Sequence, residues 1–303
     1  MKAVVLVGGF GTRLRPLTLT TPKQMLPVVD RPMIEHVLAW LGGHGVDSAV
    51  LSLGYRPDAF LEAYPDGVCA GVELIYAVEP EPLDTAGAVR FAAEHAGIDD
   101  TFVVVNGDVL TDLDLGALWS FHRASGGEGT IALTPVDDPS RYGVVPIDAE
   151  GRVLEFVEKP APGTAPTNWI NAGTYVLEPS TLARIDSGRR VSIERETFPA
   201  VVADRALFAM QSDAYWIDAG VPPTYVQAQL DLVEGRRSVG AEAIAADASL
   251  SAGAVFEHSI AMAGTVIEPE AIVRRSVLLP GAHVRAGAVV EQSIIGPRAV
   301  VGA

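Results

Sequence analysis

The chain has 303 residues, of which 49% are hydrophobic and 20% charged, and its formal net charge is −16. This length and composition can bury one large core and a smaller second one, while the negative charge argues against general nucleic-acid binding and against long-range attraction of an anionic substrate. The single cysteine, Cys69, permits no internal disulfide, and no apolar run reaches the length of a membrane helix. We therefore expect a soluble cytoplasmic protein with no signal peptide and no membrane partner.

Apolar runs typical of strands alternate with helical patterns from the first residues to about residue 234. The expected strands cover 2–7, 48–53, 72–78, 102–106, 129–135, 143–147, 153–157 and 170–177, and the expected helices cover 32–41, 85–96, 114–124, 193–203 and 222–234. This alternation predicts an α/β fold with a doubly wound, mostly parallel, Rossmann-like sheet. In such a sheet the ligand binds at the carboxyl ends of the strands.

The first strand leads into a glycine-rich loop, Gly8-Gly9-Phe10-Gly11-Thr12-Arg13, with Pro22-Lys23 close behind. Glycines let backbone N–H groups approach phosphate oxygens, and Arg13 and Lys23 add positive charge. The loop lacks the ending of a Walker motif, and Leu14 stands where the dinucleotide fingerprint has its third glycine. The pattern predicts a polyphosphate site of another kind, although glycines at a strand end also form purely structural turns.

Only three lysines, Lys2, Lys23 and Lys159, occur beside nineteen arginines. An ammonium group is a point charge suited to one phosphate oxygen, whereas a guanidinium is a planar fork. A lysine retained in such a chain either occupies a place that requires a point charge or survives on the surface by chance. The positions of Lys23 after the glycine loop and of Lys159 between an apolar strand and Pro160 favour the first interpretation.

Further motifs follow the loop in a fixed order: Val105-Asn106-Gly107-Asp108, Tyr142-Gly143-Val144-Val145, Glu158-Lys159-Pro160, Asn171-Ala172-Gly173 and Trp216-Ile217-Asp218-Ala219-Gly220. Over nearly the whole chain this order resembles the sugar-1-phosphate nucleotidyltransferases, also called nucleotide-sugar pyrophosphorylases. Glu79-Pro80-Glu81-Pro82-Leu83 with Thr85-Ala86-Gly87 is most similar to the base-binding segment of the mannose-1-phosphate guanylyltransferase branch.

The resemblance implies transfer of a nucleoside monophosphate from a nucleoside triphosphate, with GTP favoured, to a sugar 1-phosphate, with mannose 1-phosphate favoured. Pyrophosphate leaves and GDP-mannose forms. The sugar phosphate is already an anion near neutral pH, so its attack on the α-phosphorus requires no general base. Catalysis then consists of holding two anions together and neutralising the transferred group.

The resemblance also implies roles for single residues. Arg13, Lys23, Asp108 and Asp218 are the expected catalytic residues: Arg13 binds the departing phosphates, Lys23 the reacting phosphate, and the two aspartates hold Mg²⁺. The nucleotide is expected to contact Leu6, Gly8, Gly9, Gly11, Thr12, Arg13, Glu79, Asp84, Thr85, Gly87, Gly107 and Asp108, and the sugar phosphate Gly143, Glu158, Lys159 and Asn171. Read alone, the two aspartates are also typical of turns, and six histidines without paired spacing argue against zinc.

The choice of base depends on Glu79 and on the turn that follows it. Guanine presents two neighbouring N–H donors that a carboxylate accepts as a pair, whereas uracil and thymine present a donor beside acceptors, which suits an amide. Glu79 therefore favours guanine. Asp84 stands where the family usually has glycine, and its side chain either crowds that turn or caps the next helix, which leaves the base open.

The pattern changes after Arg237. Ile260, Val266, Ile272, Leu278, Val284 and Val290 are spaced six residues apart, and Ile295 and Val301 continue this spacing after a slip of one residue. This period predicts a short left-handed parallel β-helix of about three coils of about eighteen residues. We expect a catalytic domain over 1–237 and a β-helix, or hexapeptide-repeat, domain over 238–303. The pattern runs on without an evident polar cap, so we expect the second domain to form a homo-oligomer.

Three alternatives remain beside the guanylyltransferase hypothesis. The chain could be a uridylyl- or thymidylyltransferase acting on glucose 1-phosphate or a related sugar 1-phosphate. It could also be a non-catalytic homologue that binds nucleotide sugar and regulates a partner, although such proteins tend to lose a metal ligand or a phosphate cation. An acyltransferase built on the β-helix, with His258 or His283 as base, has too few coils for a coenzyme site.

Overall fold

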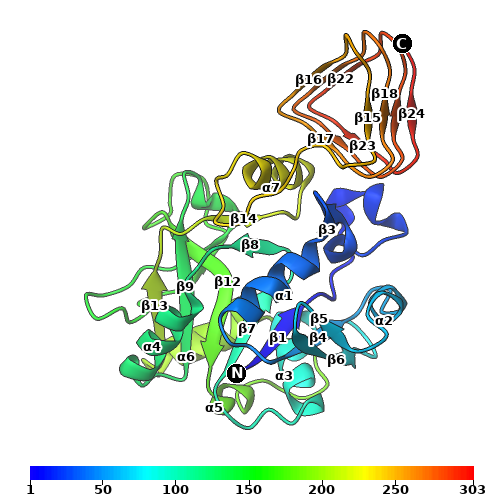
Figure 1. Cartoon of the computed structure of the whole chain (residues 1–303). Coiled ribbons are helices and arrows are strands. Elements are labelled where there is room, and N and C mark those ends of the chain that lie inside the picture. The colour runs from blue at the N-terminus through cyan, green and yellow to red at the C-terminus, as the bar shows by residue number, and fades with distance from the viewer. The chain divides into compact units, whose positions relative to one another are not determined.

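The computed structural model describes residues 1–303, and the chain divides into two compact units (Figure 1). The first unit comprises Met1–Phe10 and Ile34–Trp216, and the second comprises Gly11–Met33 and Ile217–Ala303. The second unit thus joins part of the glycine loop to the C-terminal repeat, and the boundary expected after Arg237 stays a prediction. None of the helices is both long and apolar enough to cross a membrane.

The first unit is built on a ten-stranded sheet with the order β11-β10-β12-β7-β1-β4-β6-β5, to which β9 is added beside β12 and β13 beside β9. The strands are β1 (Lys2–Leu6), β4 (Ser48–Leu53), β5 (Val68–Cys69), β6 (Val72–Val78), β7 (Phe102–Asn106), β9 (Gly129–Pro135), β10 (Gly143–Val144), β11 (Val157–Glu158), β12 (Trp169–Leu177) and β13 (Leu207–Gln211). Strands β7, β1, β4 and β6 are parallel neighbours, whereas β12 runs antiparallel to both β7 and β9. The expected parallel sheet is therefore confirmed at its centre and is mixed beyond β7.

Helices of this unit pack against the sheet (Figure 1). They are α1 (Met33–Gly43), α2 (Asp58–Ala63), α3 (Asp84–His95), α4 (Leu115–Ser125), α5 (Pro179–Leu182) and α6 (Phe198–Ala203). The main core joins central strand residues such as Val4, Val50 and Val104 to apolar positions of α3 and α6. The central strands are buried on both faces, as their unbroken apolar sequences predict.

Several predicted elements differ in the structure. The strand expected over 153–157 is reduced to an isolated bridge at Val153 and to β11, which begins at Val157. The segment runs past the start of β13 and past β10 without continuous pairing. The helix expected over 193–203 is a π-helical turn, Ile193–Thr197, followed by α6. Strand β13 was not predicted, since its five residues carry no turn signal that separates them from the preceding helix.

The C-terminal repeat forms a parallel β-helix of three sheets, β15-β18-β21-β24, β16-β19-β22 and β17-β20-β23 (Figure 1). The strands are β15 (Ser249–Leu250), β16 (Val255–Glu257), β17 (Ile260–Ala261), β18 (Val266–Ile267), β19 (Ile272–Arg274), β20 (Val277–Leu278), β21 (His283–Val284), β22 (Val289–Glu291), β23 (Ile294–Ile295) and β24 (Val300–Val301). Ser249 pairs with Val266, Val266 with His283 and His283 with Val300, so one coil takes seventeen residues and not eighteen.

The seventeen-residue coil corrects the predicted six-residue spacing of the buried positions. The buried positions step by six, five and six residues, as in Ile267, Val273, Leu278 and Val284. Val266 was expected inside, but 36% of it is exposed and its neighbour Ile267 is buried. A side of the coil that is one residue shorter shifts the strand's inward face by one position, because neighbouring residues of a strand point to opposite faces.

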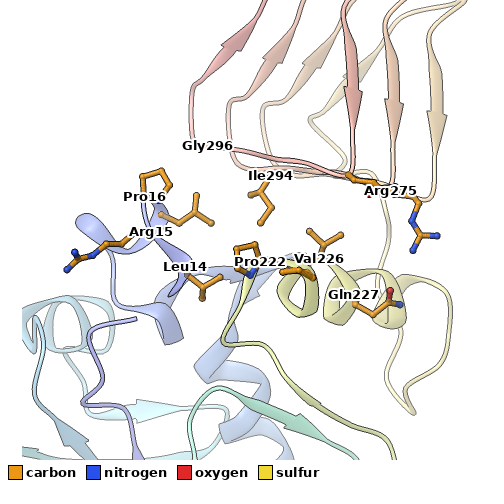
Figure 2. A pocket seen from close by; sticks show the side chains of 12 residues that line it. Leu14, Arg15, Pro16, Pro222, Val226, Gln227, Arg275, Ile294 and Gly296 are labelled. Atoms are coloured by element: carbon orange, nitrogen blue, oxygen red, sulfur yellow. The ribbon is translucent and has the colours of Figure 1, made fainter. Parts of the chain in front are cut away.

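The second unit also contains residues 11–33 and α7 (Pro222–Val233). Strands β2 (Pro27–Val28) and β3 (Arg31–Pro32) pair antiparallel, the Val29 N–H donates to Gln229 Oε1 at 3.2 Å, and the Tyr225 hydroxyl donates to the Pro27 carbonyl. A cavity of about 650 Å³ lies between residues 14–17, the start of α7 and turns of the β-helix (Figure 2). None of the predicted site residues lines this cavity.

Candidate active site

The parallel strands bring their carboxyl ends to one edge of the central sheet. Leu6 of β1 pairs with both Ser52 of β4 and Asn106 of β7, and Leu53 pairs with Val78 of β6. Residues directly after these strands therefore share this edge. They include Gly8, Gly54, Glu79, Gly107 and Asp108, of which all except Gly54 were predicted site residues.

Two glycines at this edge are required by close contacts. A Cβ atom on Gly107 would lie 2.6 Å from Cγ1 of Val7, and one on Gly54 would lie 2.9 Å from the carbonyl oxygen of Gly8. Real Cβ atoms do not approach other atoms so closely. Any larger residue would force the strand ends apart, so these glycines keep the edge compact around the glycine loop.

The carboxylate of Glu79 is held directly against the first glycine of the loop. Ser52 Oγ donates to Glu79 Oε1 at 2.9 Å, and the Leu83 N–H donates to Oε2 at 3.0 Å. A Cβ atom on Gly8 would lie 3.0 Å from Oε1. Each carboxylate oxygen keeps a lone pair for another donor, so Glu79 presents two neighbouring, fixed hydrogen-bond acceptors beside Gly8.

The second part of the glycine loop lies in the second unit, together with Arg13 and Lys23. Gly11 has φ +61, and a Cβ atom there would lie 3.0 Å from Thr18 Cγ2 and 3.1 Å from Lys23 Cβ. Thr18 Oγ1 donates to the Gly11 carbonyl at 2.8 Å, and Thr12–Leu14 form a 3₁₀ turn that exposes Arg13. Gly11 and Lys23 are therefore neighbours, and Thr12, which follows Gly11, is exposed. Gly9, in the first unit, is exposed as well.

The segment after Glu79 turns at Asp84 in a conformation that suits glycine. Asp84 has φ +61, a left-handed conformation that glycine adopts freely and aspartate tolerates better than most residues. Its Oδ1 accepts from the Thr85 N–H at 2.9 Å, in the first turn of α3, whereas Leu83 at the N-cap makes no side-chain capping bond. Gly87 has a packing reason as well, because a Cβ atom there would lie 2.7 Å from the Arg189 carbonyl.

The predicted sugar-phosphate residues gather around β10, β11 and β12. Gly143 pairs with Glu158, and a Cβ atom on Gly143 would lie 2.6 Å from the Phe156 ring and 3.2 Å from Glu158 Oε2. Lys159 Nζ donates to Glu158 Oε1 at 2.7 Å. Lys159 also has φ +50, a left-handed conformation that is costly for a residue with a side chain.

Asn171 joins this group through an irregularity in β12. The register of β12 against β9 shifts between Asn171 and Tyr175. Gly173 in this irregularity has φ +73, and a Cβ atom there would lie 2.5 Å from Asn106 Nδ2. Asn171 Oδ1 accepts from the Gly173 N–H at 2.9 Å, and its Nδ2 donates to the Tyr175 hydroxyl at 2.8 Å. Such bulges re-aim side chains next to functional sites.

Tyr175 and Glu194 are polar residues of this region that sequence reasoning missed. Burial, followed by the charge of Glu194 and, less strongly, that of Glu158, raises the pKa of the Tyr175 hydroxyl, so both carboxylates lie near it. Tyr175 was hidden inside an apolar strand. Nothing in the sequence separates Glu194 from Glu196, because only the π-helical turn decides which of the two faces Thr85, whose Oγ1 donates to Glu194 Oε2 at 2.8 Å.

The two predicted metal ligands belong to different units. Asp108 follows β7 in the first unit and is 9% exposed. Asp218 ends β14 (Trp216–Asp218), lies in the second unit and accepts from the Gly220 N–H at 2.8 Å through Oδ1. No three histidine, cysteine, aspartate or glutamate side chains form a group able to hold a metal by themselves.

Residues 2–235 match the nucleotidyl transferase family, and residues 223–303 match the GlmU-like C-terminal hexapeptide family. The chain belongs to the nucleotidyl transferase family. It is 43% identical over 235 residues to a mannose-1-phosphate guanylyltransferase of Mycobacterium tuberculosis, an alignment that covers 77% of this chain and 65% of that protein. The resemblance inferred from the ordered motifs is therefore confirmed.

Other proteins match over different spans. A probable mannose-1-phosphate guanylyltransferase 3 of Oryza sativa subsp. japonica is 39% identical over 321 residues, which covers 100% of this chain and 88% of the rice protein. The crystal structure of HddC from Yersinia pseudotuberculosis complexed with GMP-PN matches with a TM-score of 0.63 and 30% identity, covering 75% of this chain and 97% of HddC. The chain spans less than two thirds of the mycobacterial relative and of two fungal ones, at 65%, 62% and 62% of their lengths.

Proposed function

We propose that this chain transfers GMP from GTP to mannose 1-phosphate, with release of pyrophosphate and formation of GDP-mannose. The observation that carries the choice of base is the fixed carboxylate of Glu79 beside Gly8. The N1–H and N2–H₂ groups of guanine donate side by side, and the two oxygens of Glu79 each keep a lone pair that can accept them. The names of the matched relatives support the same base and the same sugar.

The proposed chemistry needs positioning and charge and no general base. A sugar phosphate oxygen attacks the α-phosphorus of GTP while the bond to pyrophosphate breaks on the opposite side. Lys23, adjacent to the glycine loop, would bind the reacting phosphate, and the exposed Arg13 would bind the leaving β- and γ-phosphates. These local cations are needed because the chain carries a net charge of −16.

Lys159 is proposed to bind the phosphate of the sugar. Its ammonium group now contacts Glu158 Oε1 at 2.7 Å, with 59% of the Lys159 side chain exposed. An exposed pair of this kind contributes little to stability, so exchange of this contact for a phosphate costs little. Glu158, Asn171 and the backbone of Gly143 are proposed to bind sugar hydroxyls, since a carboxylate accepts from them and an amide both donates and accepts.

Asp108 and Asp218 are proposed to hold Mg²⁺, and the donor set fits this ion. Magnesium is usually bound by one or two carboxylates while substrate phosphates and water complete its shell, so a third protein ligand is not required. When bound, the ion would neutralise charge on the phosphates. The small exposure of Asp108 keeps its carboxylate fixed before substrate arrives.

The reaction is tested by incubating the purified chain with each common nucleoside triphosphate and either mannose 1-phosphate or glucose 1-phosphate, with pyrophosphate release as the readout. We expect the highest kcat/KM for GTP with mannose 1-phosphate. A preference for UTP or dTTP would replace the guanylyltransferase proposal with the uridylyl- or thymidylyltransferase alternative. Binding of GDP-mannose without turnover of any triphosphate would favour a regulatory homologue.

The metal ligands are tested with Asp108→Asn and Asp218→Asn, because an amide has a similar shape but no charge for Mg²⁺. Each variant should lose at least about 100-fold in kcat and require more Mg²⁺ for half-maximal rate. Asp99→Asn, at an exposed position, is the matched control and should behave as the wild type. Wild-type turnover with unchanged Mg²⁺ dependence in either variant removes that residue from the site.

We further propose a cytoplasmic location and a homo-oligomer formed through the β-helix.

A further inference from the structure

Glu194 lies in the π-helical turn Ile193–Thr197 and is held there by two hydroxyl groups. Thr85 Oγ1 and Ser192 Oγ each donate to Glu194 Oε2 at 2.8 Å. The Ile193 N–H donates to Thr85 Oγ1 at 2.8 Å, so Thr85 is itself fixed by the turn that it supports. Short π-helical segments are rare and occur often at functional sites.

Both hydroxyls donate to the same carboxylate oxygen. Oε1 of Glu194 accepts neither of these hydrogen bonds, and no lysine or arginine forms an ion pair with the side chain. Glu158 and Glu196 differ in this respect, since Lys159 pairs with the first and Arg189 with the second. Glu194 is thus an oriented, partly buried carboxylate with one oxygen available to a neutral donor.

The surroundings of Glu194 are those of the proposed sugar site. The Tyr175 hydroxyl accepts from Asn171 at 2.8 Å, and the charges of Glu194 and Glu158 both act on that hydroxyl, as the raised pKa of Tyr175 reflects. The Tyr175 ring packs edge-on against Phe198, the first residue after the π-helical turn, at 5.1 Å between centroids. Thr85 connects this group to the segment that carries Glu79.

We propose that Glu194 binds a hydroxyl group of the sugar phosphate through Oε1 and thereby acts as a second specificity carboxylate beside Glu158. The inference rests on the proposed function, because it assigns a residue to that same site. A sugar ring presents several neutral O–H donors, and a carboxylate without a cation accepts them in strong charge-assisted bonds. Ser192 and Thr85 would serve as positioning residues that keep Oε1 directed to the sugar.

The competing interpretation is that Glu194 only ties α3 to the π-helical turn. A purely structural contact would affect every sugar equally, whereas a contact to one hydroxyl affects only sugars that carry it. The test therefore measures kcat/KM with mannose 1-phosphate and with its 2-, 3-, 4- and 6-deoxy analogues. Wild-type protein is compared with Glu194→Gln, Glu194→Asp and the control Glu196→Gln. The control alters the same turn, in which Glu196 Oε1 accepts from the Ser192 N–H at 3.2 Å.

We expect Glu194→Gln to lower kcat/KM for mannose 1-phosphate about 10- to 100-fold, mainly through KM, with KM for GTP unchanged within about 2-fold. One deoxy analogue should be poor for the wild type and lose no further activity in Glu194→Gln, since the contact is already absent. Glu196→Gln should keep the wild-type pattern. If Glu194→Gln does not fold, Glu194→Asp must show the same selective loss, because a carboxylate shorter by one methylene cannot reach both partners.

An equal loss for the parent sugar and for all four analogues would overturn the inference and leave the proposed function intact. If the wild type turns over no sugar phosphate, the proposed function fails by itself, and calorimetric titration with GDP-mannose then decides the assignment of Glu194. Equal affinity of wild type and Glu194→Gln for GDP-mannose would overturn it, and weaker binding by Glu194→Gln alone would support it.

Discussion

Glu79→Gln is the substitution that most directly examines how the base is chosen. In the structure one carboxylate oxygen accepts from Ser52 Oγ at 2.9 Å and the other from the Leu83 N–H at 3.0 Å. The Leu83 N–H can only donate, so the amide oxygen of the substituted side chain must take that position. The amide NH₂ group then faces Ser52, whose hydroxyl can turn and accept. Both internal contacts survive, but one of the two acceptors for guanine becomes a donor.

The expected cost follows from that single reversal. A hydrogen bond to a charged group contributes about 1.5 to 3 kcal/mol, and loss of one such bond corresponds to about a 10- to 150-fold change in affinity. A donor placed against a donor adds to this loss. Because the internal hydrogen bonds remain, we expect the melting temperature to change by less than about 2 °C.

The assay is steady-state kinetics with GTP, UTP and dTTP at saturating sugar phosphate, together with thermal unfolding. KM for GTP should rise at least about 10-fold in Glu79→Gln, and the ratio of kcat/KM for GTP over UTP should fall by a similar factor. Glu81→Gln, at an exposed position in the same segment, serves as the control. An unchanged KM for GTP in a well-folded Glu79→Gln variant would refute the assignment of this carboxylate to the base.

Three further outcomes are expected. Lys159→Arg should lower kcat/KM for the sugar phosphate at least about 10-fold, because a planar fork replaces a point charge, while Lys2→Arg should not; equal kinetics for the two variants would contradict the role of Lys159. Gly287→Ala should destabilise the β-helix by about 1 to 2 kcal/mol in urea unfolding through backbone strain alone, since φ is +73 and a Cβ atom there meets nothing within 4 Å. Glu270→Gly, at the equivalent corner one coil earlier with φ +62, should stabilise the β-helix. The reverse order of stabilities would exclude backbone strain at this corner. Hydrogen bonds from Arg184 hold the pKa of Glu128 below its usual range. This pair therefore stabilises the fold at a pH above the ordinary glutamate pKa, and the stabilisation is lost as the pH falls through the lowered pKa. The melting temperature of Glu128→Gln should fall less than that of the wild type between about pH 5 and pH 2, and an equal fall would contradict this role.

The sequence predicted local elements well where one physical cause dominates. The strands at 48–53, 72–78, 102–106 and 129–135 have the predicted bounds. Three of them are buried on both faces, whereas the strand at 72–78 contains exposed residues such as Glu73 among its buried ones. The glycine loop, Lys23 and the residues after the central strands were also predicted, since parallel strands meet at one edge. Individual roles at that edge, including metal ligation by Asp108 and Asp218, stay predictions.

Long-range packing decided what the sequence left open. Gly87 could be interpreted as a ligand contact, but only the fold brings the Arg189 carbonyl to 2.7 Å from the place of its missing Cβ. The coil of the β-helix takes seventeen residues because one of its three sides is shorter, and that is visible only when the strands pair across coils.

The sequence by itself determined the order of the strands along the chain and the position of the glycine turn, because these depend on neighbouring residues. Its scarcity of lysine, a matter of composition alone, already singled out Lys23 and Lys159. Only the tertiary structure decided that Glu79 stands against Gly8 and that Glu194, rather than Glu196, faces Thr85. Such contacts join segments up to 109 residues apart. Their geometry depends on how separate elements pack, and no local pattern records it.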